Sequence, residues 1–193
     1  HEFITQGALA LFEHTIETGG ETEILKFSSK AIEQIKEGNT DTDALVSADA
    51  EFWDAHKHFD NEEFRSASNW ILIMKERIIA ELTRETPNGE LARKWLGRAF
   101  HTIQDFYSHS NWTELTLLSP PARTGINMDL GRRTMNAPPI SEMACATPVA
   151  TSHLLANFRG LTTGYFFDAT GCDTAVNRRL PPSKCYHGGL GCS

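Results

Sequence analysis

The segment 100–112 constrains the chain most, because it places His101, Asp105 and His109 four residues apart within an apolar frame. Residues four apart are neighbours on an α-helix, and their direction drifts by only about 40° per step. Imidazole and carboxylate ligands without thiolate suit Zn²⁺ and other borderline divalent ions, usually in catalytic centres that keep a position for water. A single histidine on a helix is more often a core or surface residue than a metal ligand. The prediction of a metal-binding face therefore depends on the spacing of all three residues.

Charge and hydropathy narrow the function classes. The 193-residue chain carries 18 Lys and Arg against 25 Asp and Glu, a formal net charge of −7, without a dense basic run. Binding along a nucleic-acid backbone relies on cationic patches, so this class is disfavoured unless bound cations supply the charge. No apolar run approaches the about 20 residues that a membrane span needs. The length suits a single domain over residues 1–193 with an irregular final third.

All four cysteines lie in the last quarter of the chain, at Cys145, Cys172, Cys185 and Cys192, without a Cys-x-x-Cys pair. An even number in a Gly- and Pro-rich segment fits two disulfides that pin loops, and disulfides indicate an oxidising compartment. The alternative is four reduced, buried thiols. We therefore expect a secreted, extracellular protein, and a chain that begins at His1 without Met fits a mature or trimmed product.

Apolar periodicity predicts a helical body over residues 1–115. One amphipathic stripe runs from Ile4 to Ile16 and ends at Gly19-Gly20, and a second helix is expected over about 23–36. Asp60, with Glu63 three residues later, resembles a capping box that opens a third helix reaching Leu82. The helix that carries the three predicted ligands is expected over about 90–108, after a Pro-Asn-Gly turn.

The composition of residues 116–193 predicts a long, loop-rich C-terminal segment that wraps around the helical body. Pro, Gly, Thr and Asn dominate after Ser119-Pro120-Pro121, apart from a short helix expected near 150–158. With the two disulfides, the predicted fold is all-α, a helical bundle with a disulfide-tied C-terminal segment.

Further candidate ligands lie upstream. His58 stands just before the third helix, Asp49 nine residues earlier, and His1 at the head of the first helix. If these helices bundle antiparallel, their ends converge on the His101 face. The alternative for Asp49 is a helix-capping acid. For His1 it is a disordered terminus or a cloning remnant, because His-Glu-Phe can follow an affinity tag.

Five segments carry a resemblance to a known family: residues 1–9, 58–62, 101–112, 161–166 and 184–189. Together they resemble the Het-C domain, known from fungal heterokaryon-incompatibility proteins and from bacterial and animal relatives, some with a von Willebrand factor A domain. The resemblance covers essentially the whole chain, and Asp-Phe-Tyr-Ser-His-Ser-Asn-Trp at 105–112 is its most specific part.

More distantly, the order of ligands resembles the bacterial zinc-dependent phospholipases C and the fungal zinc nucleases, all-α enzymes with three metal ions at one end of a bundle. The resemblance implies that one zinc ion is surrounded by Asp49, His58, His101 and Asp105. It also implies that His1 binds a second zinc ion, with Asp105 as the bridge, and that His109 begins a third site.

The sequence departs from this pattern. The sequence as given has no residue before His1 to supply main-chain ligands, so we expect either that its own α-amine substitutes or that an upstream segment has been removed. No His-Glu pair four residues apart follows His109. Het-C domains continue beyond the His-Gly-Gly segment, so the chain resembles a domain truncated at its C-terminus. We therefore expect two or three zinc ions.

The resemblance implies an enzyme, a phospholipase C-like zinc phosphodiesterase that hydrolyses phospholipid headgroups with metal-activated water during transient contact with a membrane surface. Asp49 is then the general base. Phe106, Tyr107 and Trp112 can line an apolar wall for acyl chains, although such aromatics are more often core. Two alternatives stay open: a zinc nuclease on single-stranded nucleic acid, and a non-catalytic recognition or incompatibility module with structural metals. The sequence gives no basis for an oligomeric state.

Overall fold

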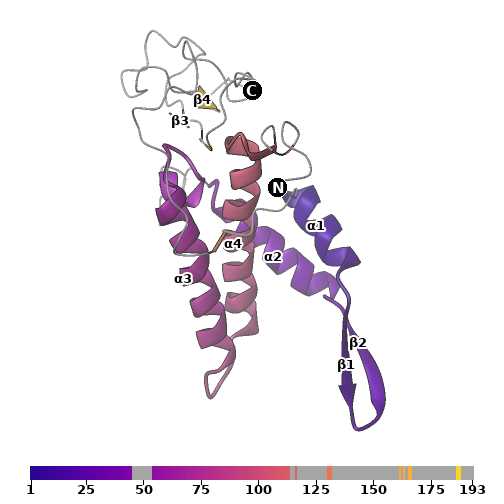
Figure 1. Ribbon diagram of the computed structural model, residues 1–193. Helices are drawn as coiled ribbons and strands as arrows, with labels where there is room; N and C mark the ends of the chain where they lie inside the picture. Colours follow the sequence, from indigo (N-terminus) through magenta and orange to yellow (C-terminus); the bar gives the residue numbers. More distant parts are fainter. Residues whose placement is uncertain are drawn as a thin grey trace. The chain divides into compact units, whose positions relative to one another are not determined.

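The computed structural model describes residues 1–44, 54–113, 116, 130–131, 161, 163, 165–166 and 186–187. The described part is mostly helical (Figure 1) and forms two compact units: His1–Phe52 with Ile73–His101, and Trp53–Leu72 with Thr102–Ser193. The two longest helices, α3 (Phe64–Leu82) and α4 (Gly89–His109), contribute residues to both units. The predicted extent of one domain over 1–193 stays a prediction.

In the first unit, α1 (Glu2–Leu11) packs against α2 (Ser29–Asp41). The Ser28 hydroxyl caps α2 by accepting a hydrogen bond of 3.2 Å from the Ala31 N–H, which satisfies one of the amides that open a helix. Between the helices, the buried Asn39 side-chain amide donates to the Thr5 hydroxyl at 3.1 Å. This bond fixes the rotation of α1 on α2, because a buried polar group is costly without a partner.

Two glycines allow α2 and the first part of α4 to approach closely. A Cβ atom at Gly97 would collide with the carbonyl oxygen of Ile35, and one at Gly38 would collide with the carbonyl oxygen of Lys94. The backbones therefore touch where most helices are separated by side chains. This contact places the C-terminal end of α2 beside α4.

Replacing Gly97 with Ala should lower the free energy of unfolding by about 1–3 kcal/mol, because the added methyl group forces the two backbones apart. The matched control is Gly7→Ala in α1, where nothing lies within 4 Å of the new Cβ. That change should stabilise the chain by about 0.5–1 kcal/mol through helix propensity. Urea unfolding of both variants is the measurement, and a Gly97→Ala variant as stable as the wild type would contradict the close approach.

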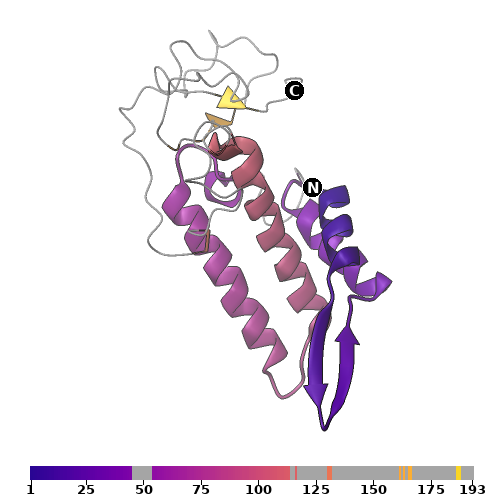
Figure 2. The same ribbon diagram turned by 45° about the vertical axis from the view of Figure 1, so that its right-hand side comes forward.

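A β-hairpin follows α1, which corrects the all-α prediction. Strands β1 (His14–Thr18) and β2 (Glu21–Leu25) pair antiparallel, with Thr18 opposite Glu21. Figure 2 shows them side by side, joined by a tight turn. Gly19 and Gly20 form that turn with φ of 62° and 88°, the left-handed values that a two-residue hairpin turn requires. The first predicted helix therefore ends at Leu11, and the second begins at Ser29 instead of near Glu23.

The later helices were predicted well. Helix α4 covers the expected range, and the Asn88 side chain opens it by accepting from the Leu91 N–H at 3.0 Å. Helix α3 carries the expected apolar series but begins at Phe64, so Asp60 is not part of its first turn. Within the first unit, the guanidinium groups of Arg77 and Arg98 lie 4.7 and 5.0 Å from the Trp95 ring, a cation–π arrangement that links α3 to α4.

An aromatic core organises the second unit. Phe59, Phe64, Ala67 and Phe106 are fully buried, and the ring centroids of Phe59 and Phe106 lie 5.2 Å apart in an edge-to-face arrangement. Tyr107 and Trp112 pack against this cluster. These three aromatics of the 105–112 segment, with Phe106 at the centre, therefore belong to the core, the alternative that the sequence left open.

The second unit also contains short elements. A 3₁₀ turn, η2 (Ala55–Lys57), precedes the loop that leads into α3. Strand β3 (Tyr165–Phe166) pairs parallel with β4 (Tyr186–His187), so two segments quoted for the family resemblance are adjacent.

Two predictions for the C-terminal segment fall outside the described residues. All four cysteines and the short helix near 150–158 lie there. The disulfide-tied C-terminus is therefore not supported, and the extracellular location that depended on it stays a prediction. Among the described helices, none is long and apolar enough to cross a membrane.

Candidate metal centre

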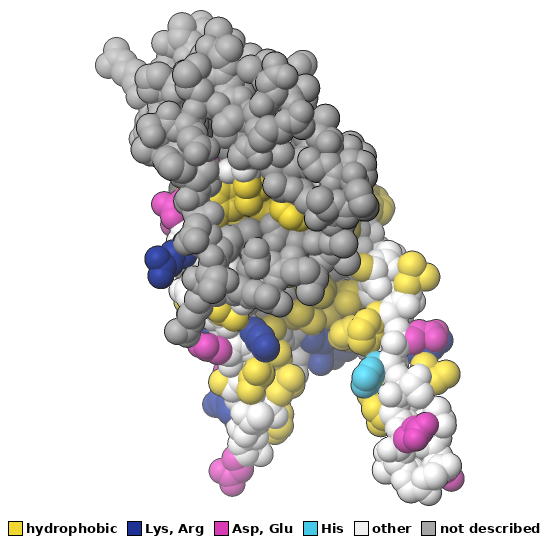
Figure 3. All heavy atoms as spheres, in the orientation of Figure 1, with side chains coloured by type: hydrophobic (Ala, Val, Ile, Leu, Met, Phe, Trp, Pro, Cys, Tyr) yellow, Lys and Arg dark blue, Asp and Glu magenta, His cyan; other side chains and the backbone are white. Residues whose placement is uncertain are grey.

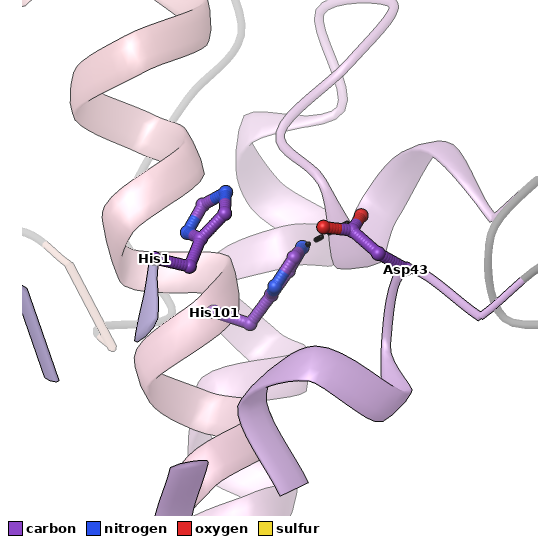
Figure 4. A group of neighbouring side chains, drawn as sticks. All are labelled: His1, Asp43 and His101. Atoms are coloured by element: carbon purple, nitrogen blue, oxygen red, sulfur yellow. Dashed lines mark ion pairs between the residues drawn. The ribbon is translucent and has the colours of Figure 1, made fainter. Parts of the chain in front are cut away.

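The first unit gathers two histidines and an aspartate, His1, Asp43 and His101, which we call the His101 cluster. One ligand atom from each lies within 4.8 Å of the others. The buried His101 Nε2 is 3.4 Å from Asp43 Oδ1, and the His1 ring stacks on the His101 ring with centroids 4.3 Å apart. Figure 4 shows His1 and Asp43 on two sides of the His101 imidazole. His1 and Asp43 are exposed, so this cluster is open to ligands on one side.

Helix ends bring the His101 cluster together. His1 immediately precedes α1, and Asp43 follows α2 by two residues. The Asp43 N–H donates to the Thr40 carbonyl at 3.1 Å, and the Thr42 hydroxyl donates to the Gly38 carbonyl at 3.3 Å, which keeps the chain turned after α2. Since Gly38 touches α4, the end of α2 delivers Asp43 to the side of α4 that carries His101.

The second unit gathers His58, Asp60, Asp105 and His109, which we call the His109 cluster. His58 Nδ1 lies 2.9 Å from Asp105 Oδ2, and His109 Nδ1 lies 3.1 Å from Asp60 Oδ1. On its other side, His109 Nε2 is 3.6 Å from Asp105 Oδ1. The carboxylates and His58 are buried, whereas the side chain of His109 is 20% exposed. His109 therefore sits between two buried carboxylates at the edge of solvent.

Electrostatics in the His109 cluster favour a cation. Burial lowers the pKa of His109, but the charges of Asp105 and Asp60 and the hydrogen bond to Asp60 outweigh it and raise the pKa to about 9. His109 is therefore protonated at neutral pH in the metal-free protein. By contrast, burial lowers the pKa of His56, which lies two residues before His58. The positive charge that His109 carries is the charge that a metal ion would replace.

The donor atoms fit a zinc-type ion. In a tetrahedral zinc site with bonds of about 2.0–2.1 Å, neighbouring ligand atoms lie about 3.3 Å apart. The separations between His101 Nε2 and Asp43 Oδ1, 3.4 Å, and between His109 Nε2 and Asp105 Oδ1, 3.6 Å, are close to this value. Both are longer than a good charge-assisted hydrogen bond. Nitrogen and carboxylate oxygen are also the ligands that zinc takes in catalytic sites.

The structure brings together five of the six predicted ligands, in two groups. His1 and His101 meet in the first unit. In the second, Asp105 contacts His58 through one oxygen and His109 through the other. Asp49 lies outside the described residues, so its roles as ligand and general base stay predictions. The bridging role of Asp105 and the number of zinc ions also stay predictions.

Sequence reasoning missed Asp43 and misread Asp60. The family resemblance implied a later His-Glu pair as the partners of His109, whereas in the structure Asp60 from an earlier loop contacts His109. Asp60 stands two residues after His58, and that proximity was the available signal, obscured by its resemblance to a helix cap. Asp43 carried no signal beyond its place after a predicted helix.

Comparison with known proteins identifies relatives of the chain. The family model described as the VWA7 N-terminal domain matches residues 10–191. Human von Willebrand factor A domain-containing protein 7 is 31% identical over 140 residues, and the rat and mouse proteins of the same name are 32% identical over 135 and 138 residues. These alignments cover 68–70% of this chain, which spans only 14% of the length of each relative. No solved structure matches.

The Het-C resemblance is wrong as a family assignment. The matching family is the VWA7 N-terminal domain over almost the whole chain, and no Het-C family matches. The motifs that carried the resemblance are the segments with the candidate ligands and two short segments that contain glycine. Such motifs restrict the chemistry of a site more than they restrict membership of one family.

Proposed function

We propose that this chain, which belongs to the VWA7 N-terminal domain family, binds divalent ions of the zinc type and hydrolyses phosphodiesters. The observation that carries the proposal is the convergence of histidines and aspartates from separate segments, with ligand spacings near those of a zinc site. The proposal concerns this chain, which spans 14% of its curated relatives.

The His109 cluster supports metal binding through its charge. Asp60 and Asp105 are both buried, and buried carboxylates are stable only when they are paired or coordinate a metal. In the metal-free protein, protonated His109 pairs with both carboxylates, through Nδ1 with Asp60 and through Nε2 with Asp105. A divalent ion held by Asp105 and His109 Nε2 would neutralise Asp105 and leave the Nδ1–H group to pair with Asp60. Asp105 is oriented by His58 Nδ1 at 2.9 Å, which fixes one carboxylate oxygen and leaves the other towards His109.

The chemistry of hydrolysis follows from the class of ion. A bound zinc-type ion acts as a Lewis acid towards a phosphoryl oxygen and lowers the pKa of its water towards 7. The chain's own residues hold the ligand geometry, and His101, buried on α4, is the fixed member of its cluster. Asp43, whose side chain is 47% exposed, is accessible to solvent and substrate. Asp49 remains the proposed general base.

Exposed apolar residues support a phospholipid as substrate over a nucleic acid. Helix α1 leaves Phe3 88% and Leu11 84% exposed, and Ile24 and Leu25 are exposed on β2. Figure 3 shows hydrophobic side chains at the surface around α1 and the start of the hairpin. Large exposed apolar side chains that gather in one region mark contact surfaces. With a net charge of −7, the chain is poorly suited to a polyanion.

The test is hydrolysis of phosphatidylcholine vesicles and of single-stranded DNA by the zinc-loaded chain. We expect release of a phosphorylated headgroup, its loss after chelation and its recovery with Zn²⁺, because the ion supplies the Lewis acid. A His14→Ala variant is the matched control, since His14 lies exposed on β1 outside both clusters. Cleavage of DNA alone would show that the chain is a nuclease and would exclude a phospholipid as substrate. Absence of both activities in the metal-loaded protein would overturn the proposal that the chain hydrolyses phosphodiesters.

A further inference from the structure

We infer that Thr163 is a positioning residue for the metal ligands of the His109 cluster, an inference that rests on the proposed metal binding. Thr163 is fully buried, with 0% of its surface exposed. It lies about fifty residues beyond α4, in a segment that the proposed chemistry does not use. Its contacts reach both chain segments that carry ligands of the cluster.

The first set of contacts joins Thr163 to the loop between η2 and α3. The Glu62 N–H donates to the Thr163 hydroxyl at 2.9 Å, and the Thr163 N–H donates to Glu62 Oε2 at 3.2 Å. The two bonds are reciprocal and buried, so they hold Thr163 and Glu62 against each other. A carboxylate acceptor makes the second bond stronger than one between neutral groups.

The loop between η2 and α3 needs such support because its backbone conformation is energetically unfavourable. Phe59, Asn61 and Glu62 have φ of 53°, 56° and 64°, in the left-handed region that residues with a Cβ rarely adopt. Such conformations persist only where the surrounding structure enforces them, and they concentrate at functional sites. The loop presents His58 and Asp60 to the cluster, and the His58 carbonyl lies 2.7 Å from His109 Nδ1. Any relaxation of the loop would therefore move His58, which contacts Asp105, and Asp60, which holds the His109 ring through Nδ1.

The second set of contacts joins Thr163 to the end of α4. Thr163 forms an isolated antiparallel bridge with Ser110, the residue after His109. Ser110 is itself held, because its hydroxyl donates to the Phe106 carbonyl and accepts from the Trp112 N–H at 3.3 Å. Thr163 thus ties the strained loop to the helix end that carries Asp105 and His109. Thr163 therefore contacts both halves of the cluster and adds to the direct contacts of His58 with Asp105 and of Asp60 with His109.

The test is titration of the full chain with Co²⁺, whose visible absorption reports the ligand set. Thr163→Val keeps the shape but removes the hydroxyl, and we expect a loss of about 10–100-fold in Co²⁺ affinity with an altered spectrum. Thr163→Ser restores the hydroxyl and should return both close to the wild type. The matched control is Thr83→Val at the exposed end of α3, where the hydroxyl bonds only to α3 carbonyls in its known contacts and affinity should not change.

If Thr163→Val fails to fold, Glu62→Ala provides a second test. The Glu62→Ala change removes the carboxylate that accepts from the Thr163 N–H, so it should also weaken Co²⁺ binding. Wild-type binding with unchanged affinity and spectrum in the folded Thr163 and Glu62 variants overturns the inference alone. Equal losses in Thr163→Ser and Thr163→Val also overturn it, since the hydroxyl would then be irrelevant. A wild-type chain that binds no Co²⁺ overturns the proposed metal binding, and the inference with it.

Discussion

Replacing Asp105 with Asn will abolish metal binding at the His109 cluster and, with it, phosphodiester hydrolysis. Asp105 is 1% exposed and faces His58 through one oxygen and His109 through the other. The amide keeps the shape of the carboxylate but loses its charge, and it can offer only one oxygen. We expect affinity for Zn²⁺ to fall by more than the about 10–100-fold that loss of an outer hydrogen-bond partner costs.

Competition between Zn²⁺ and a chromophoric chelator measures the Asp105→Asn effect. Asp41→Asn is the matched control, because Asp41 lies in the last turn of α2 outside both clusters. The control should keep wild-type affinity and activity. If Asp105→Asn binds zinc as tightly as the control does, Asp105 is not a ligand and the His109 cluster is a hydrogen-bonded network.

The stability of the metal-free chain should fall as the pH rises from about 6.5 to 9. His109 has a folded-state pKa of about 9, raised from 6.5 because Asp105 and Asp60 outweigh burial. A group with a raised folded-state pKa stabilises the fold fully below its unfolded pKa and loses that contribution as the pH passes through the folded value. The loss is on the order of 3 kcal/mol at most, given about 1.4 kcal/mol per pKa unit.

Urea unfolding in the presence of a chelator, from pH 6 to 9.5, measures this dependence. In His109→Gln the pH dependence that His109 contributes should disappear, so the plot of unfolding free energy against pH should become flatter. The metal affinity should instead increase as the pH rises, by up to about tenfold per pH unit below 9, because the ion and the proton compete for His109. A variant curve parallel to that of the wild type would show that His109 does not carry the charge.

The sequence predicted α4 well because its signals agree. The apolar residues repeat with helical period, Asn88 and Gly89 mark the start, and the breaker Ser119-Pro120-Pro121 lies beyond the end. The hairpin was missed because Gly19-Gly20 ends a helix as readily as it turns a hairpin. Thr15-Ile16-Glu17 is too short for its alternation to be distinguished from a helical stripe.

The candidate site was predicted where its ligands are local and missed where they are not. His101, Asp105 and His109 share one helix, so their spacing is enough to suggest a common ligand face, and their roles as metal ligands stay predictions. Asp43 and Asp60 become neighbours of His101 and His109 only through tertiary contacts. Asp43 reaches His101 because α2 and α4 approach closely at Gly38 and Gly97. Asp60 reaches His109 because the loop before α3 adopts left-handed backbone conformations. A local sequence pattern encodes neither arrangement.

Elemental analysis of the full chain, loaded with excess Zn²⁺ and freed of unbound ion by gel filtration, tests the central claim most directly. We predict at least one tightly bound zinc ion per chain, lower content in His101→Ala and in Asp105→Asn, and unchanged content in the His14→Ala control. Wild-type protein that is folded but retains no stoichiometric metal would contradict the account.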